Sequence, residues 1–309
     1  MRVFDADATR AALPFERLVP ALKAMFAAGS EAPPRHVHEV RSPGGGFTSL
    51  IMPAWVPGRC YGVKTINVAP GNAALGLPGL HAVYLLFDAT TGVPLALLDG
   101  DELTARRTVA ASALAASWLA REDARHLLIV GAGRIAKQLP AAYRVVRPIE
   151  RATVWARSAA KAEALAGELR GEGIAAEAAT NLEAAVRAAD IVSCATLSET
   201  PLIHGPWLQP GSHLDLIGGF TPAMREADDD CFAGAEIYID TDEALKKSGD
   251  LLGPMSRGVF AASDVRGTLA TLARGEAAGR RSHEERTVFK SVGHALEDLA
   301  AAMLVSPST

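Results

Sequence analysis

A short apolar run followed directly by a glycine-rich turn limits the fold of this chain more than any other feature. Residues 127–130 read Leu-Leu-Ile-Val, and Gly131-Ala-Gly133-Arg-Ile-Ala136 follows them. An all-apolar run of this length is typical of a strand buried on both faces of a parallel sheet. The G-x-G-x-x-A pattern then opens a helix, which is the setting that dinucleotide-binding turns require. We therefore predict a Rossmann-type domain that begins near residue 121.

Each small residue of this turn has a physical role in such a site. Gly131 allows the tight turn, Gly133 lets the backbone approach a pyrophosphate, and Ala136 keeps the helix close to the strand. Free N–H groups at the start of the helix then face the phosphates. The alternative is a turn that is only structural. The predicted cofactor-binding residues of the turn are Gly131, Ala132, Gly133, Arg134 and Ile135.

The end of the next predicted strand indicates which dinucleotide is used. An NAD site usually places Asp or Glu there to bind the ribose 2′-hydroxyl. This chain has Ala156 and Arg157, followed by Ser158 and, one helical turn later, Lys161. Arg157 can bind a 2′-phosphate through paired hydrogen bonds, and no carboxylate is present to repel it. We predict a preference for NADP(H), with use of NAD(H) left open; the alternative is that Arg157 is a solvated loop residue.

Two patterns of secondary structure divide the chain. Residues 121–287 alternate between strands and helices, which predicts a parallel sheet covered by helices. Residues 1–120 hold a helix at 15–28, several strands separated by turns, and a helix at 101–120, which predicts a mostly antiparallel sheet. We interpret the strand-like run VFKSVG and a final helix near 295–303 as returning to this first domain, an interpretation that only the family resemblance described below supports. The expected fold class is α/β, with a Rossmann-type domain at 121–287 and an α+β domain formed by 1–120 with 288–309.

Composition excludes several classes of protein. The 309 residues carry a net charge of −4, which does not favour nucleic acid as a partner. No apolar stretch approaches the roughly 20 residues that span a bilayer, and the start does not resemble a signal peptide. The three cysteines are far apart and the histidines are scattered, so we expect no disulfide framework and no metal site. We expect a cytoplasmic protein that does not bind membranes.

Several segments together resemble the ornithine cyclodeaminase/mu-crystallin family. They are PPRHVHEV, YGVKTIN, ELTARRTVAAS, LLIVGAGRIA, PGSHLDLIGGFTPAMREAD and VFKSVGHALED, and the third is the most specific. The resemblance covers nearly the whole chain. It implies a split first domain that also forms a homodimer, and a cleft between the domains where cofactor and substrate meet. The family also includes imine reductases, amino-acid dehydrogenases and proteins that only bind small ligands.

Three basic residues match the substrate pocket of this family. They are Arg35, Lys64 and Arg107, with Arg41 as an alternative to the first. An arginine suits bidentate binding of a small acid's carboxylate. A lysine near the reacting carbon can orient the substrate or supply a proton. The resemblance thus implies catalytic roles for Lys64 and Arg107 and substrate binding by all three residues.

One departure from the family's cyclodeaminases matters for function. These enzymes have an acidic residue after two glycines, and here Phe220 follows Gly218 and Gly219. A carboxylate manages the proton transfers of cyclodeamination, and phenylalanine cannot. Phe220 instead offers an apolar wall to a ring. Glu226 and Asp228 follow, and we interpret them as tethers of the loop, with substitution for the missing acid as the alternative.

Other candidate residues lie at strand ends. Thr196 ends a predicted strand at an edge where such sheets bind ligands, with a helix cap as the alternative role. Ser291, Val292 and Gly293 match a segment that approaches the nicotinamide in the family. Thr221 is a candidate to bind substrate or position a water. The proton donor stays open between Lys64 and such a water.

These observations predict an NADPH-dependent imine reductase. The sequence GFTP-x-MREAD resembles that of the family's bacterial pyrroline-2-carboxylate and piperideine-2-carboxylate reductases. This resemblance implies that the substrate is one of these small cyclic imino acids and the product L-proline or L-pipecolate. The alternatives are an ornithine cyclodeaminase with recycled NAD, an open-chain amino-acid dehydrogenase, and a non-enzymatic binder of NADPH or a small ligand.

Overall fold

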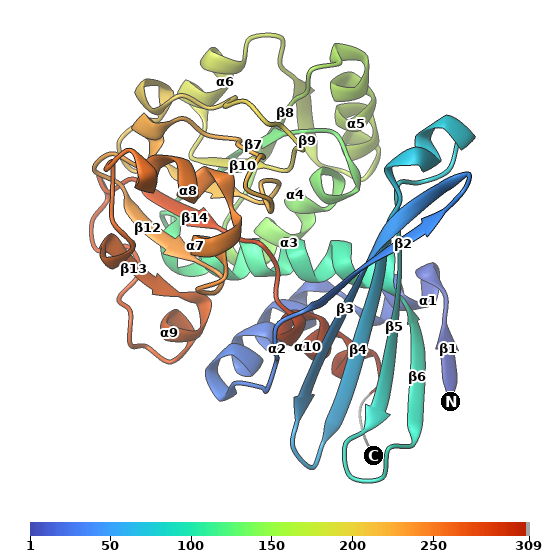
Figure 1. The fold of residues 1–309 in the computed structure, drawn as a ribbon. Helices are drawn as coiled ribbons and strands as arrows, with labels where there is room; N and C mark the ends of the chain where they lie inside the picture. Colours follow the sequence, from blue (N-terminus) through green and yellow to red (C-terminus); the bar gives the residue numbers. More distant parts are fainter. Residues whose placement is uncertain (307–309) are drawn as a thin grey trace. The chain divides into compact units, whose positions relative to one another are not determined.

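The computed structural model describes residues 1–306, which form two compact units (Figure 1). The first unit comprises Met1–Arg107 and the described residues from His294 onward, and the second comprises Thr108–Gly293. Helix α3 (Gly100–Leu119) contributes residues to both units. No helix within residues 1–306 is both long enough and apolar enough to cross a membrane.

The first unit is built on a six-stranded sheet with the order β1-β6-β5-β4-β3-β2. All neighbouring strands pair antiparallel except β1 and β6, which are parallel, so the predicted mostly antiparallel sheet is confirmed. The strands are β1 (Arg2–Phe4), β2 (His36–Ser42), β3 (Gly45–Val56), β4 (Cys60–Val68), β5 (Leu80–Asp88) and β6 (Pro94–Asp99). The unit also holds α1 (Ala6–Ala12), α2 (Phe15–Ala28), the 3-10 turn η1 (Pro70–Leu75) and α10 (Ala295–Val305).

Helix α10 covers one face of this sheet, and α2 packs against α10. Helix α10 packs against α2 and against β3, β4 and β5. Side chains alternate across a strand, so Gly62, Lys64 and Ile66 of β4 share the helix-covered face and are buried, whereas Tyr61 is exposed on the other face. The alternation thus places a charged residue, Lys64, in the interior beneath α10.

The second unit is an eight-stranded parallel sheet with the order β13-β12-β14-β11-β10-β7-β8-β9 (Figure 1). Its strands are β7 (His126–Val130), β8 (Arg151–Trp155), β9 (Ala175–Ala178), β10 (Ile191–Cys194), β11 (His213–Leu216), β12 (Glu236–Ile239), β13 (Val265–Thr268) and β14 (Thr287–Lys290). Its helices after α3 are α4 (Arg134–Val146), α5 (Ala159–Gly171), α6 (Leu182–Ala188), α7 (Ala244–Lys247), α8 (Gly249–Ser256) and α9 (Leu269–Ala273). Short 3-10 turns are η2 (Gly205–Trp207), η3 (Asp229–Cys231) and η4 (Ala262–Asp264).

The strand order of this sheet reverses between β7 and β10. From β7 the chain proceeds outward to β8 and β9, then returns to form β10 on the other side of β7. In open parallel sheets, ligands bind at the carboxyl ends of the strands at such a reversal. All five residues of β7 are buried, as the apolar run predicts. The predicted α/β fold class, with one parallel and one antiparallel sheet, is confirmed.

The run VFKSVG departs from its predicted place. The sequence assigns it to the first domain, but Val288–Lys290 belong to β14, which pairs in parallel with β11 and β12 in the second unit. A short apolar run fits either sheet, so its pattern does not decide between them. The predicted boundaries, 1–120 with 288–309 and 121–287, otherwise stay a prediction, and residues 307–309 lie outside the described residues.

Candidate functional site

The glycine-rich turn lies at the carboxyl end of β7, next to the end of β10. Gly131 has φ +120°, a conformation that side chains rarely adopt, and a Cβ there would lie 2.6 Å from the carbonyl oxygen of Ala195. Its N–H donates to the carbonyl oxygen of Trp155 at 2.8 Å. Only glycine fits this position, where the turn joins the ends of β7, β8 and β10.

Gly133 differs from Gly131 because the fold itself does not require it. It is the N-cap of α4 with φ −97° and ψ −172°, values open to any residue, and a Cβ there would meet no atom within 4 Å. No side chain caps α4 at this end. The first turn of a 13-residue helix thus presents its N–H groups beside open space. These features fit a dinucleotide pyrophosphate, because such a group binds at a helix N-terminus.

Replacing Gly133 by aspartate separates a binding turn from a structural one. Aspartate is a favourable N-cap, so the melting temperature of Gly133→Asp should equal or slightly exceed that of the wild type. Its carboxylate would fill the open space and repel a pyrophosphate, so we expect the Kd for NADPH to rise by at least about tenfold. Fluorescence titration of NADPH beside thermal unfolding measures both effects.

The control is Gly131→Ala, which should weaken NADPH binding and also lower the melting temperature, because its Cβ collides with Ala195. Unchanged NADPH affinity in a stable Gly133→Asp protein would mean that the turn only connects a strand to a helix.

The carboxyl end of β8 carries the residues that the sequence assigns to the adenosine side of the cofactor. Arg157, Ser158 and Lys161 are all exposed there. The Ser158 hydroxyl caps α5, accepting from the N–H of Lys161 at 3.4 Å. Among residues 1–306, the Arg157 side chain forms no hydrogen bond or ion pair. Its guanidinium is therefore exposed at the carboxyl end of β8, where the sequence predicts contact with the ribose of a dinucleotide.

A buried cluster of four charged residues lies in the first unit. Lys64 of β4 and Arg107 of α3 meet Glu297 and Asp298 of α10, and all four are buried. The Lys64 Nζ lies 2.6 Å from Asp298 Oδ2. Arg107 donates from Nε to Asp298 Oδ1 at 2.9 Å and from a terminal nitrogen to Glu297 Oε2 at 2.6 Å. The structure thus brings together the two residues predicted to be catalytic.

The cluster sets the charge state of Lys64. Burial lowers the pKa of Lys64 to about 8, while the neighbouring Asp298 carboxylate opposes this shift. An ammonium with such a pKa can release a proton near neutral pH. Arg35, the third predicted basic residue, is half-buried directly before β2.

Sequence reasoning missed Glu297 and Asp298 as functional candidates. Both lie in the segment VFKSVGHALED, and they follow His294, the N-cap of α10. Their helix is otherwise apolar, and an acidic pair in its first turn is also what a helix N-terminus favours. The signal in the sequence was that two acids in the final helix, Glu297 and Asp298, had no assigned role and matched in number the two predicted catalytic basic residues.

Glu226 ties the loops that follow β10 and β11. Its Oε1 accepts from the backbone N–H and the hydroxyl of Thr196 at 2.7 and 2.8 Å, and its Oε2 accepts from the N–H of Gly218 at 2.7 Å. Asp250 in turn accepts from the N–H of Glu226 at 2.7 Å, and Lys290 lies 3.5 Å from Asp250. The interpretation of Glu226 as a tether is confirmed. Thr196 lies at the predicted strand end, and its hydroxyl is engaged by Glu226.

Asp228 also has a structural role. It caps η3 by accepting from the N–H of Cys231 and also accepts from the N–H of Gly205. The hydrogen bonds of both carboxylates therefore hold loops and a turn of the second unit. Phe220 is 45% exposed, directly beyond Gly218 and Gly219.

The remaining predicted site residues follow neighbouring strands of the same sheet. Thr221 accepts a hydrogen bond from Gly249 through its carbonyl oxygen at 3.0 Å. Ser291 is buried, and its N–H donates to Leu216 of β11. The N–H groups of Val292 and Gly293 both donate to Asp240 at 2.7 Å. Residues 291–293 and 218–221 therefore extend from adjacent strands, β14 and β11.

The buried Glu226 carboxylate should make stability depend on pH. Burial raises its pKa to about 7, although Lys290 opposes the shift. A raised carboxyl pKa means that stability is lost as pH rises from the unfolded value of about 4.5 through about 7. Relative to Glu226→Gln, the wild-type free energy of unfolding should therefore fall by about 1 kcal/mol per pH unit in this window. Urea unfolding at several pH values checks this, and a difference that rises with pH would contradict it.

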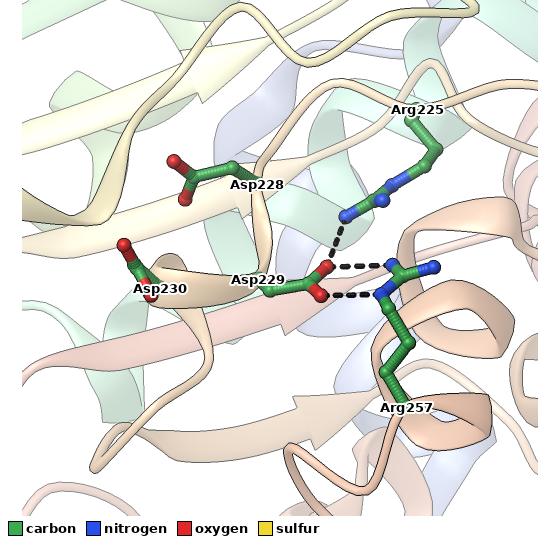
Figure 2. A pocket seen from close by; sticks show the side chains of 5 residues that line it. All are labelled: Arg225, Asp228, Asp229, Asp230 and Arg257. Atoms are coloured by element: carbon green, nitrogen blue, oxygen red, sulfur yellow. Dashed lines mark hydrogen bonds and ion pairs between the residues drawn. The ribbon is translucent and has the colours of Figure 1, made fainter.

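A pocket near η3 is lined by five charged residues, and three of them, Arg225, Asp229 and Arg257, pair with one another. Figure 2 shows Asp229 between Arg225 and Arg257, with Asp228 and Asp230 pointing away from both. Asp229 accepts from Arg225 at 2.8 Å and from Arg257 at 2.5 and 2.7 Å. These bonds, led by that from Arg257, lower the pKa of Asp229 to about 2. Because its charges pair internally, we do not place the functional site here.

Metal-binding side chains do not gather in the described part of the chain. Within residues 1–306, no three His, Cys, Asp or Glu side chains are placed to hold a metal ion. The cysteines Cys60, Cys194 and Cys231 are buried and form no disulfide within these residues.

Comparison with known proteins points to one family. A family model described as the ornithine cyclodeaminase/mu-crystallin family matches residues 7–309. A Delta(1)-pyrroline-2-carboxylate reductase of Paracoccus denitrificans is 45% identical over 261 residues, covering 84% of this chain and 83% of that protein.

Solved structures agree over nearly the whole length. The Delta(1)-pyrroline-2-carboxylate reductase of Thermococcus litoralis, in complex with NADH and L-proline, has a TM-score of 0.92 and 31% identity, covering 99% of this chain and 96% of that chain. An archaeal alanine dehydrogenase dimer with bound NAD has a TM-score of 0.89 and 29% identity, covering 99% and 94%. The predictions of family, of fold class and of an oxidoreductase are confirmed by these matches.

Proposed function

Since the chain belongs to the ornithine cyclodeaminase/mu-crystallin family, we propose that it reduces a cyclic imino acid with NADPH. The substrate is pyrroline-2-carboxylate or piperideine-2-carboxylate, and the product is L-proline or L-pipecolate. The observation that carries the proposal is the buried Lys64 ammonium, held beside Arg107 in the first unit. The relative from Paracoccus denitrificans, named as a reductase of such an imine, supports it.

The charges of the buried cluster explain how the proposed site binds an imino acid. Arg107 binds the substrate carboxylate together with Arg35 and Lys64. A guanidinium carries five N–H donors, so contact with α10 and contact with a substrate are compatible. The cluster holds two cations and two carboxylates, and burial strengthens each interaction because the local dielectric constant is low. Phe220, exposed at the loop after β11, offers an apolar surface to the ring.

Lys64 supplies the proton that the imine nitrogen needs. Protonation converts the imine to an iminium, whose C2 then accepts a hydride. The bound dinucleotide supplies that hydride. The Lys64 pKa of about 8 keeps the ammonium charged at neutral pH and still acidic enough to donate.

A preference for NADPH over NADH forms part of the proposal. Its support is Arg157 at the end of β8, with Ser158 and Lys161 beside it and no carboxylate between Trp155 and Lys161. An arginine at this place pairs with a 2′-phosphate, whereas an acidic residue would repel it. The solved reductase from Thermococcus litoralis is in complex with NADH, so the proposed preference rests on the residues at the end of β8 in this chain alone.

We assign substrate binding and dimerisation to the first domain and dinucleotide binding to the second. The sheet face opposite Lys64 exposes Val40, Tyr61 and Val83, which are apolar side chains suited to a homodimer interface. An archaeal relative of the same fold is a dimer.

Product analysis tests the substrate class. Purified protein is incubated with NADPH and either pyrroline-2-carboxylate, piperideine-2-carboxylate, or pyruvate with ammonia, and the amino acids are separated on a chiral phase. We expect L-proline or L-pipecolate from the cyclic imines and no alanine. Alanine as the main product would instead assign an open-chain amino-acid dehydrogenase.

A further inference from the structure

Asp298 contacts both basic residues of the buried cluster. One carboxylate oxygen lies 2.6 Å from Lys64 Nζ, and the other accepts from Arg107 Nε at 2.9 Å. Lys64 and Asp298 are completely buried. A carboxylate that bridges two cations in this way fixes the distance between them and their orientation.

The charged and titratable groups around Lys64 come from three elements, whereas β3 contributes the apolar Met52 beside it. Helix α10 contributes Asp298 and Glu297, α3 contributes Arg107, and β5 contributes Tyr84, which pairs with Lys64 across the sheet. Burial disfavours the ammonium and Arg107 repels it, whereas both carboxylates favour it, Asp298 more than Glu297. Burial also raises the pKa of Tyr84, so its phenol stays neutral. Asp298 is therefore the main group that compensates the Lys64 charge.

We infer that Asp298 is a positioning residue that keeps Lys64 charged and aimed at the imine nitrogen. The inference rests on the proposed function, because the proton matters only if Lys64 donates it. In each turnover the N–H bond of Lys64 breaks and an N–H bond forms on the imine nitrogen. Lys64 is left as a neutral amine and takes a proton from water before the next turnover, while Asp298 stays ionised throughout.

Substitution of Asp298 tests this role through a direct titration. Asp298→Asn keeps the shape and removes the charge, Asp298→Glu keeps the charge, and Glu297→Gln is the matched control on the neighbouring residue. The Lys64 pKa is measured by NMR of 13C-labelled lysine, with Lys64→Met identifying the signal. We expect Asp298→Asn to lower that pKa by about 1–3 units. Glu297→Gln should lower it less, and Asp298→Glu should largely retain it.

The pH dependence of turnover gives an independent readout. In Asp298→Asn the basic limb of the kcat profile with pyrroline-2-carboxylate should move to lower pH, in step with the Lys64 titration. The KM for NADPH should stay within about twofold, because Asp298 lies in the first unit. Recovery of the wild-type pH profile in Asp298→Glu would support a role of the carboxylate charge. A residue with a merely structural role would not show this recovery.

Two results would overturn the inference. One is a Lys64 titration in the folded wild-type protein well below pH 7, which needs no variant. The other is a Lys64 titration that is the same in Asp298→Asn and in the wild type. Failure of the proposed function would look different. In that case the Lys64 pKa would still fall in Asp298→Asn, but no form of the protein would reduce a cyclic imino acid.

Discussion

Replacing Lys64 by methionine is expected to lower kcat with pyrroline-2-carboxylate by about 1,000-fold, in the range of a lost general acid. Methionine keeps the apolar length of the side chain and removes the ammonium that lies 2.6 Å from Asp298. Steady-state oxidation of NADPH, followed at saturating substrate, gives the change in kcat.

Lys64→Met should leave the binding of NADPH unchanged. The glycine-rich turn belongs to the second unit, so the Kd for NADPH should stay within about twofold of the wild type. The matched control is Lys246→Met, at an exposed lysine of α7, which should leave kcat unchanged. A folded Lys64→Met protein with more than a tenth of the wild-type kcat would remove Lys64 from the mechanism.

Arg157→Asp should reverse the cofactor preference. It replaces the guanidinium at the end of β8 by a carboxylate, which repels a 2′-phosphate and accepts from a ribose hydroxyl. Loss of a charge-assisted contact together with the new repulsion should lower kcat/KM for NADPH by about 100-fold. The kcat/KM for NADH should change by less than about threefold or rise.

Arg151→Asp provides the control for charge alone. Arg151 is exposed at the opposite end of β8, so this variant has the same net charge and should retain the wild-type preference. An unchanged ratio of the two kcat/KM values in Arg157→Asp would show that another part of the chain selects the dinucleotide.

Local sequence pattern predicts much of the fold, because burial and backbone geometry determine the spacing of apolar residues along helices and strands. The helix at 15–28 begins and ends where the pattern predicts, and the helix predicted at 101–120 spans Gly100–Leu119. Helix α2 buries Phe15, Leu18 and Leu22 at helical spacing and ends at Gly29 with φ +81°. The partners of β14 were not predictable in this way, because four residues fit either sheet and only tertiary pairing decides.

The candidate site was predictable only in part. The glycine turn has a strong local signal, since a strand, a tight turn and a helix follow one another directly. The ion pairs of Arg107 join residues 190 and 191 positions apart along the sequence, and Lys64 lies still further from Asp298, so no local pattern encodes these contacts. The acids of α10 also fit an ordinary helix start, which hides their second role. Glu226 was interpreted correctly as a tether, but its three donors come from two separate loops.

The most direct test of the account is to follow NADPH oxidation with pyrroline-2-carboxylate beside ammonia release from L-ornithine in the same purified protein. The account predicts stoichiometric oxidation of NADPH with the imine and no ammonia from ornithine, because Phe220 stands where a cyclodeaminase needs an acid. Ammonia release from ornithine without net oxidation of the dinucleotide would contradict it and assign the protein as a cyclodeaminase.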